Sequence, residues 1–187
     1  MIQIICILIP LVGMTALMPV VLRKCPNKHV KWLKWGVFVI YVLGNLYFTL
    51  LSRVPDSGQY LELKPFRTYG RLFESATEES TVTGFAAVFL DNTLPIVSLI
   101  LNVLLYYPLG YLLPILFTKL KPKPVILIGC LCSIATEATQ YLLKMGWCET
   151  DDVIHNTLGT AIGVWVWLWQ SKRLNAQRSA NPRKGET

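Results

Sequence analysis

Five long apolar stretches constrain the fold of this chain more than any other feature. An α-helix of about 20 apolar residues crosses the roughly 30 Å hydrocarbon core of a bilayer. Within one such segment, only a helix satisfies all of its own backbone polar groups. We therefore expect an all-α, polytopic membrane protein with about five transmembrane helices. The stretches are Ile2–Leu22, Trp35–Ser52, Thr93–Thr118, Val125–Leu143 and Val153–Ser171.

Composition supports this class and disfavours others. Hydrophobic residues make up 53% of the chain and charged residues 16%, whereas about 25% of the residues in soluble domains are charged. The net charge of +7 does not indicate nucleic acid, because the basic residues lie in loops without an aromatic platform. The cysteines form no CxxC pair, and no HExxH array is present. We expect no nucleic-acid partner, no metal and no cofactor.

The basic residues predict the orientation. Cytoplasmic loops carry an excess of Lys and Arg. Three segments of this chain hold thirteen Lys or Arg residues, and the alternate two hold five. We therefore expect a multi-pass cell-membrane protein with its N-terminus outside and its C-terminus in the cytoplasm. The basic segments are Arg23–Lys34, Lys119–Lys123 and the tail from Lys172, and the poorer ones are Arg53–Asn92 and Lys144–Asp152.

The predicted helices divide the chain into three parts. Residues 1–34 form a first helix and a basic loop, residues 35–171 a membrane domain, and residues 172–187 a basic tail. The first helix lacks the basic n-region of a signal peptide, so we expect it to be retained.

The long loop before the third stretch has two features of its own. Tyr60–Phe73 mixes aromatic and basic residues around Pro65, which fits either a segment lying in the membrane interface or a hydrated loop. Further on, Asp91 and Asn92 resemble a helix start, with Pro95 in the first turn.

The third stretch itself contains helix breakers. Pro108 and Pro114 each remove a backbone donor, and Gly110 weakens the helix between them. Such residues are tolerated in a membrane where neighbouring protein or water satisfies the freed carbonyl groups. They indicate either a broken helix beside a functional site or a simple kink.

Glu137 is the most unusual residue, because it is a carboxylate inside an apolar run. A charged side chain at the centre of a transmembrane helix costs about 2.5–3.5 kcal/mol on insertion scales, so such residues usually have a function. Ser133, Glu137 and Gln140 share one face of the fourth helix at helical spacing. This face is the core of the predicted site.

A second polar face begins the fifth helix. Asp152, His155 and Asn156 have the spacing of one helical face, and Asp151 precedes them. The connection from the fourth helix is short, so the two helices should be antiparallel neighbours. Counted along the helices, these residues converge on the outer half of the membrane with Asn102, Asn45 and Arg53.

Each of these residues also has a structural interpretation. Glu137 could be a neutral carboxyl group bonded to Asn102 or Gln140, and Asp151 and Asp152 could cap a helix. His155 could be an interface histidine. A Ser133–His155 triad is disfavoured because we place the two residues about two turns apart. Gly159 and Gly163 form a GxxxG pair that lets another helix backbone approach.

Four motifs in this order resemble the VanZ-like family of small membrane proteins. They are LKPF (Leu63–Phe66), NVLLYYPLGYLLP (Asn102–Pro114), SIATEATQYLL (Ser133–Leu143) and DDVIHNTLGTAIG (Asp151–Gly163). The resemblance implies a helical membrane protein of Gram-positive type bacteria. It also implies a link to low-level resistance to the glycopeptide antibiotic teicoplanin, without an established chemical activity.

The resemblance also implies which positions recur. They are Asn102, Pro108, Gly110, Ser133, Glu137, Gln140, Asp152, Asn156 and Gly159, with Pro65 and Phe66 in the LKPF element. This chain departs from the pattern in the turn Met145–Cys148, where many relatives have an Arg, and at Glu149, where many have Asp. If that Arg contacts an anionic ligand, Arg53 or Lys144 must replace it here.

These observations leave three functions open. The first is non-enzymatic binding, at the outer leaflet, of an envelope lipid, a lipid-linked precursor or a glycopeptide antibiotic. The second is an intramembrane enzyme with Glu137 or Asp152 as general base and His155 as partner. The third is a helix-bundle scaffold, and the oligomeric state stays open. The expected ligand-binding residues are Arg53, Asn102, Ser133, Glu137, Gln140, Asp151, Asp152 and Asn156.

Overall fold

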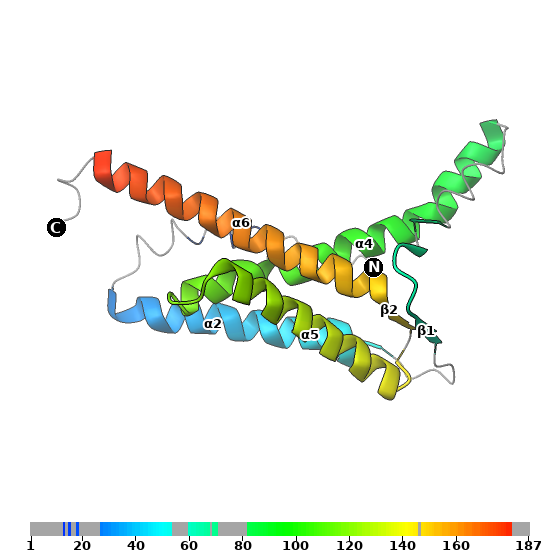
Figure 1. The fold of residues 1–187 in the computed structure, drawn as a ribbon, viewed down its shortest axis with the longest axis horizontal. Coiled ribbons are helices and arrows are strands. Elements are labelled where there is room, and N and C mark those ends of the chain that lie inside the picture. Colours follow the sequence, from blue (N-terminus) through cyan, green and yellow to red (C-terminus); the bar gives the residue numbers. More distant parts are fainter. Residues whose placement is uncertain are drawn as a thin grey trace.

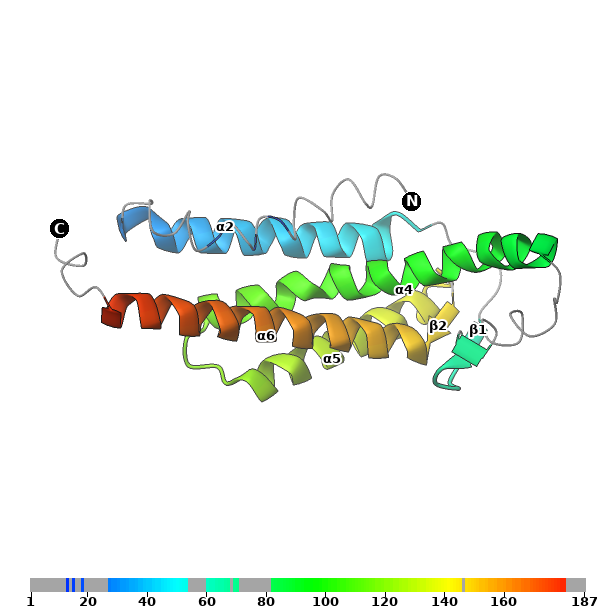
Figure 2. The same ribbon diagram turned by 90° about the horizontal axis from the view of Figure 1, so that it is seen from above.

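The computed structural model describes residues 27–53, 60–67, 69–70, 82–145 and 147–180, together with positions 13, 15 and 18. Four long helices lie side by side in this part of the chain (Figures 1 and 2). A π-helical turn, η1 (Tyr47–Leu51), continues the first of them. The expectation of a mainly helical fold is thus confirmed. The helices are α2 (Asn27–Leu46), α4 (Val82–Leu116), α5 (Pro122–Leu142) and α6 (Thr150–Ala180).

Three segments in the described residues are long and apolar enough to cross a membrane. They are His29–Leu51, Ile96–Leu116 and Pro122–Leu142, and they match the second, third and fourth predicted spans. The fifth predicted span, in α6, is not among these three, and it contains the polar residues His155, Asn156 and Gln170. The first predicted span lies outside the described residues except for three positions.

The helices extend beyond the predicted boundaries. α2 begins within the predicted basic loop, and α6 continues through the start of the predicted tail. α4 begins at Val82, so the helix start expected at Asp91 and Asn92 is wrong. The first turns of α4 project beyond the other helices (Figure 2). Asp and Asn favour helix starts because their side chains bond nearby backbone groups, but this preference is weak and does not exclude them from a helix interior.

The prolines do not interrupt α4, which stays helical from Val82 to Leu116. Pro108 and Pro114 are both fully buried. The Tyr41 hydroxyl donates a hydrogen bond to the Leu105 carbonyl oxygen, at 3.1 Å, in the turn before Pro108. Packing against neighbouring helices therefore supports a continuous helix here.

α4 and α6 meet backbone to backbone through glycines. A Cβ atom added to Gly159 would overlap the carbonyl oxygen of Val103, and one added to Gly163 would overlap that of Tyr107. From the other side, a Cβ on Gly110 would overlap the Thr160 carbonyl oxygen. Small residues permit such close approach of transmembrane helices. This contact sets how α4 and α6 are aligned.

A small parallel sheet, which the sequence did not predict, closes the end of the bundle where α6 begins (Figure 1). Strand β1 (Tyr60–Glu62) pairs with strand β2 (Trp147–Glu149), with Leu61 opposite Cys148. The sheet joins the long loop to the α5–α6 connection. Three residues per strand carry too little pattern to be recognised from sequence.

Candidate functional site

A cavity of about 130 Å³ lies at the end of the bundle where α6 begins, and we call it the polar cavity. Residues of η1, α4, α5 and α6 line it, together with Arg53, which follows η1. Six of the eight predicted ligand-binding residues are among them: Arg53, Asn102, Glu137, Gln140, Asp152 and Asn156. Residues distant in sequence, on three long helices and in the segment after η1, thus meet at one place.

The polar face of α5 forms one wall. Ser133, Glu137 and Gln140 are all buried, as their shared face suggests. Gln140 donates from Nε2 to the Thr49 carbonyl oxygen in η1, at 2.9 Å. Glu137 accepts the Glu149 backbone amide at Oε2, at 3.2 Å. These bonds link α5 to η1 and to β2.

Asn102 and Asp152 connect α4 to α6. Asn102 donates from Nδ2 to Asp152 Oδ1, at 2.6 Å. The sequence interpretation that bonded Asn102 to Glu137 is therefore wrong. Arg53 is exposed and lines the same cavity. It lies within electrostatic range of both Glu137 and Asp152. Among the described residues its guanidinium group forms no ion pair within 4 Å.

The first turns of α6 present two faces and not the single face expected. Asp152 and Asn156, four residues apart, line the polar cavity. Asp151 and His155, also four residues apart, face the loop segment that follows β1. Each step along a helix rotates the side chain by about 100°, so neighbouring i, i+4 pairs point in different directions. His155 therefore belongs to the loop contact.

The loop contact uses the LKPF element. Phe66 has a left-handed φ of 64°, and its backbone amide donates to Asp151 Oδ1 at 2.5 Å. The hydroxyl of Tyr69 lies 2.5 Å from His155 Nε2. Such a φ is unfavourable for a residue with a Cβ atom, so the surrounding contacts must hold it. Pro65 and Phe66 thus shape the turn that fastens the loop to α6.

The proposed depth difference between Ser133 and the start of α6 is wrong. Asn156, which follows His155, donates from Nδ2 to Ser133 Oγ at 2.9 Å. The two helices cross at an angle (Figure 1), so counting residues from the helix ends misjudged the relative depth. No triad results, because the His155 side chain bonds Tyr69 and does not line the cavity.

Two buried acceptors in the cavity wall lack a hydrogen-bond partner among the described residues. They are Gln140 Oε1 and Asn156 Oδ1. A buried acceptor without a partner costs about 1–3 kcal/mol, so it usually has an unseen one. Together with the two carboxyl groups they give the cavity an excess of acceptors. The arrangement suits a ligand rich in N–H or O–H donors.

Asp152 has an altered acidity. Burial, and then the neighbouring Glu149 carboxylate, raise the pKa of Asp152 from 3.8 to about 6. The residue precedes the predicted span 153–171, at the end of the bundle. Asp152 therefore changes charge near pH 6, and a titration of the protein around this pH can detect the change.

Sequence reasoning missed several residues. Thr49 contributes its carbonyl oxygen, and Thr136 lines the cavity while its hydroxyl lies 3.1 Å from that of Tyr106. Tyr69 and the Glu149 amide are also absent from the predicted set. A backbone group or a single threonine leaves no signal in sequence. Tyr69 lies in the segment Tyr60–Phe73, whose mixture of aromatic and basic residues was visible in the sequence. Asn45 lies elsewhere, bonded to the Tyr41 hydroxyl at 3.4 Å.

The described residues contain no group of three His, Cys, Asp or Glu side chains placed to hold a metal ion. The cavity offers one guanidinium group, two carboxyl groups and several amides. These groups can bind by charge and hydrogen bonding without an added ion.

Comparison with known proteins agrees with the motifs. The family model VanZ/LLP1 matches residues 38–171. Protein VanZ of Enterococcus faecium is 28% identical over 155 residues, which cover 79% of this chain and 81% of that protein. No solved structure matches this chain. The family match contains all four helices of the described bundle in whole or in part, and the chain belongs to the VanZ/LLP1 family.

Proposed function

We propose that this protein binds the headgroup of an envelope lipid or lipid-linked precursor at the outer leaflet. The observation that carries the proposal is the polar cavity, where two buried acceptors without partners lie beside two carboxyl groups and Arg53. The preferred headgroup combines hydrogen-bond donors, such as an ammonium group or hydroxyls, with a phosphate.

The positions of the charges support a particular arrangement of the headgroup. Arg53 is exposed, whereas Glu137 and Asn156 are buried. A phosphate would therefore meet the guanidinium group at the mouth, where fork-shaped donors match its oxygens. The donor group would reach the carboxyl and amide oxygens inside. An ammonium group has three donors and no acceptor, which complements such a wall.

We further propose five transmembrane helices, with the polar cavity on the external side of the membrane. The charge distribution of the loops supports this orientation. α6 runs beside α4 (Figure 1), and it carries an exposed apolar stripe of Leu158, Ile162, Trp165 and Trp169. Spacings of three and four residues place these four side chains on one helical face. Such a stripe suits contact with lipid tails.

The same site is our candidate for a role in teicoplanin resistance in the envelope of Gram-positive bacteria. This part of the proposal rests on the family and on its similarity to Protein VanZ. Catalysis has less support, because the expected partner His155 faces the loop and not the cavity. Turnover of lipid-linked precursors by purified protein would instead favour an enzyme with Glu137 or Asp152 as base.

A lipid-selection experiment tests the binding proposal. Purified protein in phosphatidylcholine nanodiscs is titrated with phosphatidylethanolamine, and bound lipid is counted by native mass spectrometry. The two headgroups share a phosphate and a positive charge, but only ethanolamine has N–H donors. We expect at least tenfold preference for ethanolamine, lost in Glu137→Gln and Asp152→Asn. The control Glu62→Gln removes an acid that pairs with Arg67 outside the cavity. Equal binding of both lipids would overturn the donor-rich headgroup.

A cellular test addresses resistance. A Gram-positive host lacking the gene expresses wild type, Glu137→Gln, Asp152→Asn or Glu62→Gln at matched membrane levels, and sensitivity to teicoplanin and vancomycin is measured. We expect wild type and Glu62→Gln to protect against teicoplanin and the two cavity variants to fail. Equal behaviour of all four strains would separate the polar cavity from resistance.

A further inference from the structure

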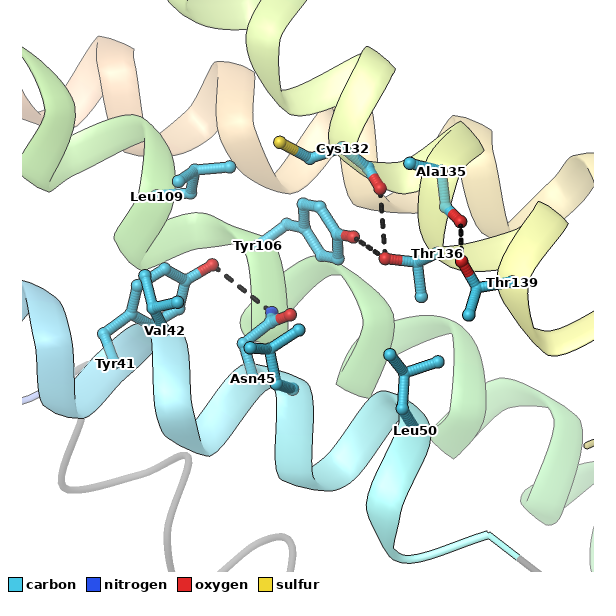
Figure 3. Close-up of a pocket in the computed structure, with 11 residues that line it drawn as sticks. Tyr41, Val42, Asn45, Leu50, Tyr106, Leu109, Cys132, Ala135, Thr136 and Thr139 are labelled. Carbon is cyan, nitrogen blue, oxygen red and sulfur yellow. Dashed lines mark hydrogen bonds between the residues drawn. The ribbon is translucent and has the colours of Figure 1, made fainter. Parts of the chain in front are cut away.

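A second, larger cavity lies between α2, α4 and α5, and we call it the apolar groove (Figure 3). Its volume is about 280 Å³, close to the lower limit of about 300 Å³ for small-molecule sites. Tyr106 and Leu109 of α4 form its floor, and residues of α2, η1 and α5 form its walls. The wall residues include Val42, Leu46 and Leu50 on one side and Cys132, Ala135 and Thr139 on the other.

The polar atoms at the groove are largely bonded to one another. The Tyr106 hydroxyl lies 3.1 Å from that of Thr136, which donates to the Cys132 carbonyl oxygen at 3.0 Å. Thr139 donates to the Ala135 carbonyl oxygen at 2.7 Å, and Figure 3 shows these bonds. Hydroxyls bonded in this way present mainly methyl and ring surface to the groove. The groove thus suits hydrocarbon better than a headgroup.

The groove continues directly from the polar cavity. Thr136 lines both of them. On the neighbouring helices, Thr49 and Leu105 line the polar cavity, whereas Leu50 and Tyr106, one residue further, line the groove. A molecule held in the polar cavity can therefore extend past Thr136 into the groove without leaving the protein surface.

The groove also has the right extent along the membrane. It reaches from Leu50, near the end of the span His29–Leu51, to Tyr41, which is about 14 Å at the helical rise. That is about half of a roughly 30 Å hydrocarbon core. Its rim residues Leu46, Cys132 and Ala135 are exposed on the outer surface of the helices. A lipid chain could enter sideways from one leaflet.

We propose that the apolar groove holds one hydrocarbon chain of the outer-leaflet lipid whose headgroup occupies the polar cavity. The inference rests on the proposed headgroup function and deepens it, because it makes the ligand an intact membrane amphiphile. A water-soluble headgroup alone would then bind far more weakly. The two cavities together form one site, with recognition at the polar end and burial of apolar surface along the groove.

Photocrosslinking tests the proposal. Nanodiscs of phosphatidylcholine contain a phosphatidylethanolamine probe with a diazirine midway along one acyl chain, and labelled residues are mapped by mass spectrometry after irradiation. We expect enriched labelling of Leu46, Leu109 or Thr139 over the exposed lipid-facing residues Leu127 and Leu131. The same chain on a phosphatidylcholine probe should label the groove at least fivefold less.

Two matched substitutions make the test specific. Ala135 lines the groove, whereas Ala138 lies outside both cavities, and both are exposed on α5. Ala135→Phe should fill the groove and reduce its labelling at least fivefold, and Ala138→Phe should leave it unchanged. Because neither side chain is buried, both variants should fold, and their melting temperatures check this.

The outcomes separate the two proposals. If Ala135→Phe abolishes groove labelling but both headgroups label equally, the chain site stands and the headgroup proposal fails. If ethanolamine is preferred in lipid counting but labelling is scattered and indifferent to Ala135→Phe, the headgroup proposal stands and the groove proposal is overturned. A disulfide between two copies through Cys132, formed on oxidation and lost in Cys132→Ser, would also overturn it, since a second copy would cover the groove.

Discussion

The first two turns of α6 carry two polar faces with similar residues and different surroundings. Asp151 and His155 face the loop, where Asp151 Oδ1 accepts from the Phe66 amide and His155 Nε2 bonds the Tyr69 hydroxyl, while His155 Nδ1 has no partner among the described residues. Asp152 and Asn156 face the polar cavity, where Asn156 Oδ1 has no partner among the described residues. We call these two faces the loop face and the cavity face. The bonded groups of the loop face stabilise its contact with the loop, whereas an acceptor without a partner that lines a cavity is available to a ligand.

The turn of α6 at Gly159, which follows these two faces, shows why the polar cavity forms only near the start of the helix. At Gly159 the backbones of α4 and α6 touch, so no cavity can form. Nearer the start of α6, Asn102 and Asp152 replace that backbone contact with a pair of side chains. Close packing at one level and polar side chains at the next thus produce a cavity of defined shape.

The largest effect is expected from Gly159→Ala. The new Cβ would overlap the Val103 carbonyl oxygen, and backbone cannot move aside as a side chain does. Overpacking of this kind costs about 1–3 kcal/mol or more, and the two faces above should lose their alignment. Thermal unfolding in detergent measures this loss of stability. Gly36→Ala is the control, because nothing lies within 4 Å of its added Cβ, and an unchanged melting temperature for Gly159→Ala would contradict the contact.

Asp151→Asn should disturb the loop face. It weakens the charge-assisted bond from the Phe66 amide, worth about 1.5–3 kcal/mol. We expect faster amide hydrogen exchange in residues 60–70, with lipid selection by the polar cavity largely retained. Asp152→Asn should show the reverse, with lost selection and little change in loop exchange. Identical profiles for the two variants would mean that the two faces do not act separately.

The pH dependence of lipid binding should report on the cavity face. Asp152 ionises near pH 6, so binding of an ammonium headgroup should strengthen about fivefold as pH rises from 5 to 7, since a charged hydrogen bond gains about 1 kcal/mol over a neutral one. Asp152→Asn should remove this rise. The groups acting on Asp152 are the carboxyl groups of Glu137, Glu149 and Asp151 and the guanidinium group of Arg53. A rise that persists in Asp152→Asn would contradict the assignment to Asp152 and point to one of the other carboxyl groups, since Arg53 keeps its charge over this range.

Stability should change with pH in the opposite sense when no lipid is bound. The pKa of Asp152 is higher in the folded protein than its ordinary value of 3.8. The folded state therefore holds this proton more tightly, and the protein should lose stability as pH rises from about 4 to 6. Asp152→Asn should flatten that part of the profile in the same melting assay.

The smallest effect is expected from Tyr69→Phe. It removes one hydrogen bond to His155 Nε2, worth about 0.5–1.5 kcal/mol, while the ring contact with Phe66 remains. Exchange in the loop should increase less than in Asp151→Asn. Tyr47→Phe changes an exposed tyrosine of η1 and serves as control. If exchange in the loop increased more than in Asp151→Asn, the bond to His155 would be the main contact that holds the loop on α6.

Much of the site was predictable because membranes make polar residues conspicuous. Glu137 stood out in an apolar run, and the helical spacing of Ser133 and Gln140 placed them beside it, as the structure does. Asn45 was expected to join the same cluster, yet it lines the apolar groove. Depth along a helix predicts poorly which side chains meet, because the helices cross at an angle and each one turns a different face to its neighbours.

The sequence alone determined the mainly helical membrane class and the polar face of α5, because helical period and hydrophobic length are local properties. Only the tertiary structure decided which acceptors have partners, that His155 turns to the loop, and that a groove continues from the polar cavity. Those features depend on the relative rotation and crossing of α2, α4, α5 and α6. Contacts between segments far apart in the chain fix that geometry, and no local pattern records it.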